Sequence, residues 1–294
     1  MNNKQKGYLF AGLTIIFWGT SASAFKIGLR YIDHFQLLLY STFTAVVFLF
    51  FVLWAQRKLK VLKTFTRKQY FNSMLLGFLN PFLYYVVLFK AYSLLPAQIA
   101  QPLNFIWPIV LVLFSIPILK QKIGLKSFVA LFISFAGVYL ISSQGDPFNH
   151  RFADPLGVTL ALGTSIVWAL FWLFNMKDQR DEVLKLFLNF VVAFFLILAL
   201  TIKESTVFPK SNEGIVTAIY VGLFEMGITF VLWLKALKLA GRTDKIGNLI
   251  YLTPFCALIF IHIFLGEKIY ITTIFGLILI VTGIMLQQLK KIRR

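Results

Sequence analysis

The chain has 294 residues, of which 59% are hydrophobic and only 14% are charged, whereas soluble domains are about 25% charged. So few charged side chains cannot cover the surface of a water-soluble globule of this size, so that class is excluded. The net charge of +18 does not indicate a nucleic-acid-binding protein, because the basic residues lie in short segments between apolar stretches. We therefore expect an all-α integral membrane protein.

Apolar stretches follow one another along the chain, each near the length of about 20 residues that a helix needs to cross a bilayer. The polar segment Met1 to Lys6 leads into an apolar stretch of more than 20 residues without an obvious small-residue cleavage site, so we expect a retained helix instead of a signal peptide. The connections are short, which predicts antiparallel neighbours in one membrane domain. The ten predicted transmembrane helices span residues 8–29, 35–55, 70–89, 95–119, 127–143, 155–176, 184–202, 215–234, 245–265 and 271–288.

Lys and Arg residues are distributed unevenly between the two sides that these helices define. If both termini are cytoplasmic, most of the 29 basic residues lie in cytoplasmic segments, as the positive-inside rule requires. This predicts a multi-pass protein of the bacterial plasma membrane, the inner membrane, with anionic lipid headgroups as nonspecific partners of its cytoplasmic face. The basic residues that would lie outside are Arg30, Lys90, Arg151, Lys203, Lys210 and Lys268.

The sequence also contains an internal repeat. The stretch from Pro108 to Leu140 aligns without gaps on Pro254 to Leu286, and in neighbouring registers Gly77 corresponds to Gly222 and Trp18 to Trp168. This divides the chain into two five-helix halves, residues 1–143 and 144–294.

Five helices is an odd number, so the second half must enter the membrane with the opposite orientation. The loop charges agree. The loop between the third and fourth helices carries Lys90 alone, whereas its copy carries Lys235, Lys238, Arg242 and Lys245. An inverted-topology repeat of this kind is typical of secondary transporters.

The sequence motifs resemble those of the EamA-type proteins of the drug/metabolite transporter superfamily. They are Phe17 to Thr20 in the first helix, the Pro108 and Pro254 helices, and Leu265 to Lys268 leading into Gly276 to Gly283. The first half departs from the pattern, because Lys120-Gln121-Lys122 stands where such proteins often carry Gly-Glu. The resemblance implies a metabolite carrier, often an exporter, whose central cavity is lined by the third, fourth, eighth and ninth helices and parts of the first and sixth.

Two polar residues lie near the middle of predicted helices, where a carboxylate costs about 2.5 to 3.5 kcal/mol. Glu225 is about ten residues into the eighth helix, and its repeat counterpart Asn80 lies equally deep in the third, so we expect them to face each other across the repeat interface. Pro81 removes a helical hydrogen bond and frees carbonyls for a ligand. The alternatives are a structural hydrogen bond for Glu225, for example to Asn80, and a packing kink at Pro81.

Further candidates lie on the helices that the resemblance places around the cavity. The fourth helix carries Gln98, Gln101 and Asn104 on one face, which indicates either a vestibule or hydrogen bonds between packed helices. Aromatic residues far from the interfacial belts are candidates for an apolar pocket. The predicted substrate-binding residues are Glu225, Asn80, Trp18, Trp168, Tyr84, Gln101, Asn104, Trp107 and Asn248.

The predicted function is secondary-active or facilitative transport of small organic metabolites, such as amino acids or amphipathic drugs, by alternating access around a midplane site. One acid without a nearby base favours neutral, zwitterionic or cationic solutes, and predicts that Glu225 exchanges a proton for the cationic group of the substrate. The chain lacks a Gly-Lys-Ser/Thr loop and metal-ligand spacing, so we expect no cofactor and no metal. We expect no nucleic-acid partner, and a monomer or homodimer. An intramembrane enzyme acting on lipid and a passive channel are the alternatives.

Overall fold

The computed structural model describes residues 2–119, 125–148, 153–239 and 248–288, and every regular element in these ranges is helical. Six helical stretches are long and apolar enough to cross a membrane, and the shorter apolar helices are Val129–Ser142, Leu249–Leu265 and Ile271–Leu286. The prediction of an all-helical membrane protein is confirmed. The six long stretches are α1 (Asn3–Gly28), α2 (His34–Ala55), Arg67–Leu94, α9 (Pro155–Asn175), α10 (Glu182–Glu204) and Asn212–Leu237.

Several predicted spans consist of more than one helical segment. The third contains α4 (Arg67–Gly77), η1 (Phe78–Leu83) and α5 (Tyr84–Leu94), and the eighth contains α11 (Asn212–Tyr220), η2 (Val221–Gly227) and α12 (Ile228–Leu239). The fourth divides into α6 (Ala97–Asn104) and α7 (Trp107–Leu119), and the ninth into η3 (Asn248–Leu252) and α14 (Thr253–Leu265). The remaining elements are α3 (Leu59–Leu62), α8 (Leu125–Ser142) and α15 (Ile271–Gln288).

Aligned prolines explain the breaks in the fourth and ninth spans. A proline ring clashes with the carbonyl four residues earlier and has no N–H to donate, so a continuous helix cannot pass through Pro108 or Pro254 without distortion. The sequence-based prediction of one helix over residues 95–119 was therefore wrong in detail. Because the two prolines occupy matching positions, both halves are interrupted at the same place.

The third and eighth spans are interrupted at matching positions too. Both η1 and η2 are wide π-helical turns, and they overlap when Gly77 is aligned with Gly222. Within η1 the backbone of Asn80 leaves the helical region, with φ −146° and ψ 121°. Single π turns inside α-helices occur frequently at functional sites. The two interruptions place Asn80 and Glu225 in irregular backbone.

Glycines at the interfaces between helices show the same contact twice, with the halves exchanged. A Cβ atom added at Gly77 would lie less than 3.0 Å from the carbonyl of Asn189 on α10, and one added at Gly222 would lie as close to the carbonyl of Ser41 on α2. The third span thus packs closely against α10, and the eighth against α2. Only a residue without a side chain permits these distances.

A second pair of contacts relates α8 to α15. In the repeat alignment Gly137 corresponds to Gly283, and Ala130 to Gly276. A Cβ atom at Gly137 would lie 2.5 Å from the carbonyl of Gly276, and one at Gly283 would lie 2.7 Å from the carbonyl of Ala130. Exchanging the halves therefore reproduces the contact, and small residues bring these two helix backbones together.

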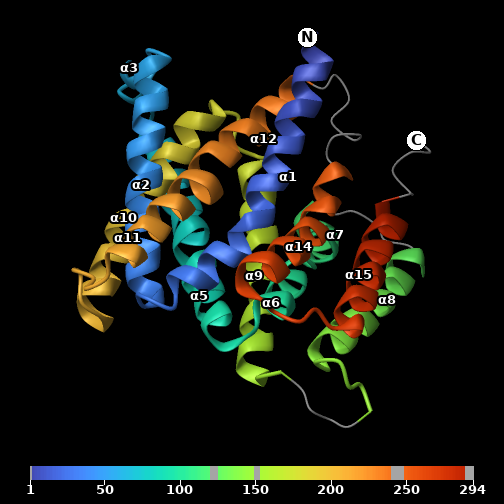
Figure 1. Ribbon diagram of the computed structural model, residues 1–294. Helices are drawn as coiled ribbons and strands as arrows, with labels where there is room; N and C mark the ends of the chain where they lie inside the picture. Colours follow the sequence, from blue (N-terminus) through green and yellow to red (C-terminus); the bar gives the residue numbers. More distant parts are fainter. Residues whose placement is uncertain (1, 120–124, 149–152, 240–247, 289–294) are drawn as a thin grey trace.

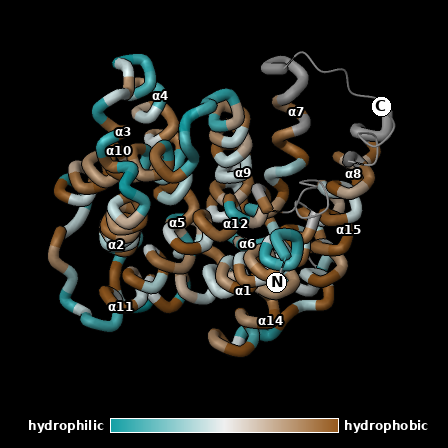
Figure 2. The backbone as a smooth tube through the Cα atoms, turned by 90° about the horizontal axis from the view of Figure 1, so that it is seen from above, coloured by the Kyte–Doolittle hydropathy of each residue, from teal (hydrophilic) through white to brown (hydrophobic). Residues whose placement is uncertain are grey.

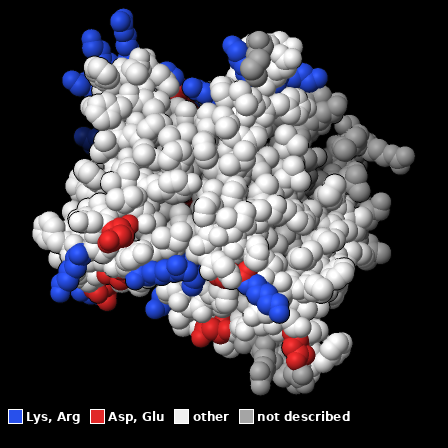
Figure 3. Space-filling model, in the orientation of Figure 1, with Lys and Arg blue, Asp and Glu red and all other residues white. Residues whose placement is uncertain are grey.

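The surface is divided into charged ends and an uncharged middle. Figure 1 places the start of α1, the end of α15 and α3 at one end of the bundle, and the connection between α10 and α11 at the other. On the face drawn in Figure 3, basic side chains gather at the first end, basic and acidic side chains mix at the second, and a broad uncharged band separates them. Apolar residues predominate along the long helices in Figure 2, and hydrophilic ones around α3 and the start of α1. This distribution suits a protein embedded in a bilayer.

Asp181 fixes the start of α10 at the end of the bundle that carries α3. Its carboxylate accepts hydrogen bonds from the amides of Val183 (3.0 Å) and Leu184 (3.3 Å) and pairs with Lys58 at 2.6 Å. Burial raises the pKa of Asp181, but the hydrogen bonds from Lys58 and from these amides outweigh it and lower the pKa below its ordinary value. Because the folded pKa is lowered, the stabilisation is present above the ordinary aspartate pKa of about 3.9 and is lost as the pH falls through the folded value.

We expect Asp181→Ala to lower the free energy of unfolding by about 1 kcal/mol at neutral pH, because it removes the helix cap. Asp181→Asn should cost less, since asparagine caps helices well. Thermal unfolding in detergent, followed by circular dichroism, measures both. The difference between wild type and Asp181→Asn should narrow below pH about 3.9. Equal stability of the Ala and Asn variants would show that the cap contributes nothing.

Candidate substrate-binding site

Glu225 lies at the centre of a hydrogen-bonded group that joins the two halves. Its side chain is 9% exposed. The Ser21 hydroxyl of α1 donates to Oε2 at 2.6 Å, and the Tyr85 hydroxyl of α5 donates to Oε1 at 2.9 Å. The indole N–H of Trp18 donates to the backbone carbonyl of Glu225 at 3.3 Å. Residues far apart in the sequence therefore hold this acid in place.

The carboxylate has hydroxyl donors but no basic partner among the residues that the structure describes. Two hydrogen bonds offset part of the cost of burying a carboxyl group, and a full charge at this depth still needs a counter-charge or a proton. Glu225 can therefore exchange a proton for a cation. A permanently paired acid could not.

Asn80 is fully buried, but it does not bond to Glu225. Neither atom of its side-chain amide has a hydrogen-bond partner in the described part of the chain. The alternative in which Glu225 bonds to Asn80 is thus wrong, and the hydrogen bonds to the Glu225 carboxylate come from Ser21 and Tyr85 instead.

The repeat alignment explains the difference between these two counterparts. The positions that match Ser21 and Tyr85 in the other half are Phe171 and Phe230, and both phenylalanines are buried. A phenyl ring offers no hydroxyl group to an amide. Of the two counterparts Glu225 and Asn80, Glu225 is consequently the one that has hydroxyl donors at these positions.

An aromatic cluster surrounds this polar group. The rings of Trp18 and Trp168 both contact Phe230, at centroid distances of 5.6 Å and 6.1 Å. Tyr84 contacts Trp168 at 4.6 Å, and it also contacts Tyr85, the donor to Glu225, at 4.8 Å. The structure therefore brings together four of the predicted residues, namely Glu225, Trp18, Trp168 and Tyr84. The faces of such rings attract cations.

The polar stripe on α6 makes hydrogen bonds between packed segments, as one of its two interpretations expects. The Tyr92 hydroxyl donates to Oε1 of Gln101 at 3.0 Å. Asn104 accepts from the Tyr84 hydroxyl at 3.2 Å and donates to Thr164 on α9 at 2.7 Å. Gln101 and Asn104 keep part of their surface exposed. The hydrogen bond from Tyr84 therefore links Asn104 to the aromatic cluster.

Two further residues, Trp107 and Asn248, were predicted for the site. Trp107 begins α7, is partly buried and packs against the hydrophobic core. Asn248 begins η3, and its side chain lies outside the described part of the structure. No group of three His, Cys, Asp or Glu side chains that could hold a metal occurs in the described ranges.

Ser21 and Thr164 are not among the residues predicted from the sequence. Ser21 lies one helical turn after Trp18, and Thr164 one turn before Trp168. A search for small hydroxyl residues on the same face as the duplicated tryptophans would have found both.

Comparison with known proteins identifies the family. The model of the EamA-like transporter family matches residues 5–143 and again residues 155–287. The chain belongs to the EamA-like transporter family. The family resemblance inferred from the sequence is therefore confirmed, and this EamA-like protein is a transporter of the membrane.

Relatives with similar sequences are also named as transporters. The uncharacterized transporter YvbV of Bacillus subtilis is 24% identical over 98% of this chain and 93% of its own length. An uncharacterized transporter of Archaeoglobus fulgidus is 25% identical over 99% of both chains. A solved crystal structure with 18% identity has a TM-score of 0.67 and covers 99% of this chain and 100% of its own, which shows a shared fold.

Proposed function

We propose that this EamA-like transporter is a secondary carrier for small organic solutes with an ammonium or other cationic group, such as amino acids or amphipathic cations. The observation that carries the proposal is the buried Glu225 carboxyl group, held by Ser21 and Tyr85 and without a basic partner in the described residues. A neutral or zwitterionic solute with an ammonium group fits the same chemistry. The exporter direction follows if the carrier exchanges its solute for protons that enter the cell.

The chemistry of the site is an exchange of positive charges. A cationic group that approaches the deprotonated Glu225 carboxylate is attracted by it and by the faces of Trp18, Trp168 and Tyr84. When the solute leaves, a proton takes its place, so the carboxyl group never stays charged and unpaired in the membrane. Each half-cycle thus carries either a proton or a cationic solute.

The transport mechanism in this proposal is alternating access around a pair of inverted five-helix repeats, residues 1–143 and 144–294, with ten transmembrane helices. The paired glycine contacts, the matching interruptions and the double match of the family model support the repeat. Basic side chains at the end of the bundle that carries α3 and the start of α1 support cytoplasmic termini in a bacterial inner membrane. Rocking of the two halves would then expose Glu225 to each side in turn.

Solute counterflow into proteoliposomes tests this proposal. Vesicles preloaded with an unlabelled amino acid or amphipathic cation should accumulate the labelled compound, and the initial rate should saturate with concentration. A proton gradient should drive net flux of the same compounds. Flux that grows linearly with concentration would instead indicate a channel, and hydrolysis of the lipid without any flux would indicate an enzyme.

A further inference from the structure

The turn between α14 and α15, in the second half, docks on the start of α6, in the first half. The Glu267 carboxylate accepts hydrogen bonds from the amides of Ala97 (2.9 Å) and Gln98 (3.1 Å), the first two residues of α6. Pro96, which precedes them, provides no side-chain cap of its own. Glu267 therefore supplies, from the other half, the negative charge and the acceptors that a helix N-terminus lacks.

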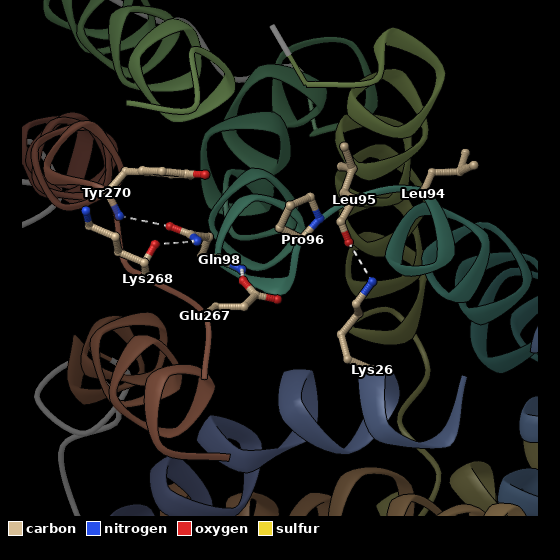
Figure 4. A pocket seen from close by; sticks show the side chains of 8 residues that line it. All are labelled: Lys26, Leu94, Leu95, Pro96, Gln98, Glu267, Lys268 and Tyr270. Atoms are coloured by element: carbon tan, nitrogen blue, oxygen red, sulfur yellow. Dashed lines mark hydrogen bonds between the residues drawn. The ribbon is translucent and has the colours of Figure 1, made fainter. Parts of the chain in front are cut away.

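Gln98 binds the same turn with every polar group of its side chain. Its amide N–H donates to the carbonyl of Lys268 at 2.9 Å, and its Oε1 accepts from the amide of Tyr270 at 3.0 Å and from the Thr273 hydroxyl at 3.3 Å. The residue is only 3% exposed. Figure 4 shows Glu267, Lys268 and Tyr270 gathered around Gln98. Separating the turn from α6 would leave these buried groups without partners.

Lys26 of α1 binds the connection between α5 and α6, here called the corner, at the α5 end. Its ammonium group donates to the carbonyls of Tyr92 (2.9 Å) and Leu95 (3.0 Å) at the end of α5. The Lys26 side chain thus binds the end of α5. The ammonium group of a lysine near the end of a membrane span is instead expected to reach the membrane surface. The corner between α5 and α6 is fixed at both of its helix ends, by a cation on one and an anion on the other.

In the proposed orientation, with both termini cytoplasmic, this corner lies toward the outer side of the membrane. Beside it lies an open cleft of about 440 Å³, lined by Lys26, Leu94, Leu95, Pro96, Gln98, Glu267, Lys268 and Tyr270 (Figure 4). Gln101 follows Gln98 by one turn of α6, and Asn104 follows Gln101 and bonds to Tyr84 in the aromatic cluster. The polar face of α6 therefore leads from the cleft to the surroundings of Glu225.

The sequence positions that match Glu267 and Lys26 in the repeat alignment carry no charge. In the repeat alignment Gln121 corresponds to Glu267, and Met176 corresponds to Lys26. Neither Gln121, which lies outside the described residues, nor Met176 carries a charge. The sequence therefore does not repeat the charges of this contact.

We propose that the contact of Glu267 and Gln98, together with Lys26, is an outer latch that holds the carrier closed on its outer side and must open in each transport cycle. The latch rests on the proposed function, because it regulates access to that site. It biases the empty carrier toward the state that is open on the cytoplasmic side.

The test measures access to a cysteine beneath the latch and needs no solute. In a Cys256→Ala background, Ala97→Cys places a thiol at the fully buried first residue of α6. We expect a membrane-impermeant methanethiosulfonate, added from outside, to modify this thiol at least tenfold faster in Glu267→Gln than with Glu267 present. Glu213→Gln, an equal loss of charge at an exposed residue in the first turn of α11, is the matched control and should leave the rate unchanged.

A second variant keeps the test decisive if Glu267→Gln does not accumulate in the membrane. Lys26→Met removes the ammonium group of the latch with little change in side-chain size. It should also raise the rate at which the reagent modifies the cysteine at position 97. Unchanged rates in these variants would refute the latch, and so would an equal increase in Glu213→Gln. Because labelling is independent of the solute, failure of every counterflow assay would count against the proposed function while leaving the result for the latch readable.

Discussion

Replacement of Glu225 by Gln is expected to reduce solute counterflow by about 100-fold and to abolish its dependence on a pH gradient. Glutamine has the shape of glutamate but cannot exchange a proton or attract a cation as a charge. Losing one partner of a buried charge pair costs about 2 to 5 kcal/mol, and about 1.4 kcal/mol corresponds to a factor of ten. Of the two oxygens that accept from Ser21 and Tyr85, glutamine keeps one.

Two further variants separate the effect of the Glu225 charge from the effects of its hydrogen-bond donors and of charge in general. Tyr85→Phe removes one donor but leaves the carboxylate, so we expect counterflow to fall by about tenfold while the pH dependence remains. Glu204→Gln removes an exposed charge at the end of α10 and should change nothing. If Glu225→Gln transports at the wild-type rate with unchanged pH dependence, proton exchange at this residue is wrong.

Replacement of Gly222 by Val should destabilise the protein by about 3 kcal/mol and abolish transport. A Cβ atom at this position collides with the backbone carbonyl of Ser41, which cannot move without shifting α2. Overpacking of this kind costs about 1 to 3 kcal/mol, and valine adds two methyl groups to the collision. Gly77→Val should have a similar effect, because its Cβ atom meets the backbone of Asn189 in the matching contact.

Gly163→Val is the matched control, since a Cβ atom at Gly163 on α9 has no neighbour within 4 Å. Its effect on stability should be within about 0.5 kcal/mol of zero, as for surface substitutions. Thermal unfolding of the purified variants in detergent measures the difference. Equal stability of Gly222→Val and Gly163→Val would mean that α2 and the eighth span do not pack as closely as described.

Hydropathy and charge predicted the all-helical membrane architecture, and six helical stretches of the described ranges are long and apolar enough to cross a membrane. Hydropathy and charge both depend on local composition, which can be read directly from a sequence. The interruption at Asn80 was also predictable, because Pro81 follows it. The one at Glu225 was not, since no proline marks it and only the packing of Gly222 and Gly227 against α2 accompanies it.

The candidate site was predicted in part. Repeat alignment and membrane depth singled out Glu225, Trp18 and Trp168, which the structure gathers in one place. They did not identify Ser21 as the donor to Glu225, because neither specifies the rotation of α1 about its axis; the position of Ser21 one turn after Trp18 does. Depth alone also suggested that Asn80 faces Glu225, whereas the lateral contacts of each broken turn decide which residues meet.

The contact that forms the latch could not be predicted from the sequence either. Leu265 to Lys268 stood out in the sequence as a family motif, but the partner of Glu267 is the backbone of α6. Backbone amides carry no signature in a sequence. Only the arrangement of the two halves reveals that this acid completes a helix of the other half.

The most direct measurement concerns the orientation of the two halves. The register that aligns Gly77 with Gly222 also aligns Lys63 with Phe208, and both residues are exposed in connections between helices. In a Cys256→Ala background, Phe208→Cys should react with an impermeant maleimide on intact cells, whereas Lys63→Cys should react only after permeabilisation. Reaction of both cysteines from the same side would contradict the inverted repeat, and with it a carrier that turns about Glu225.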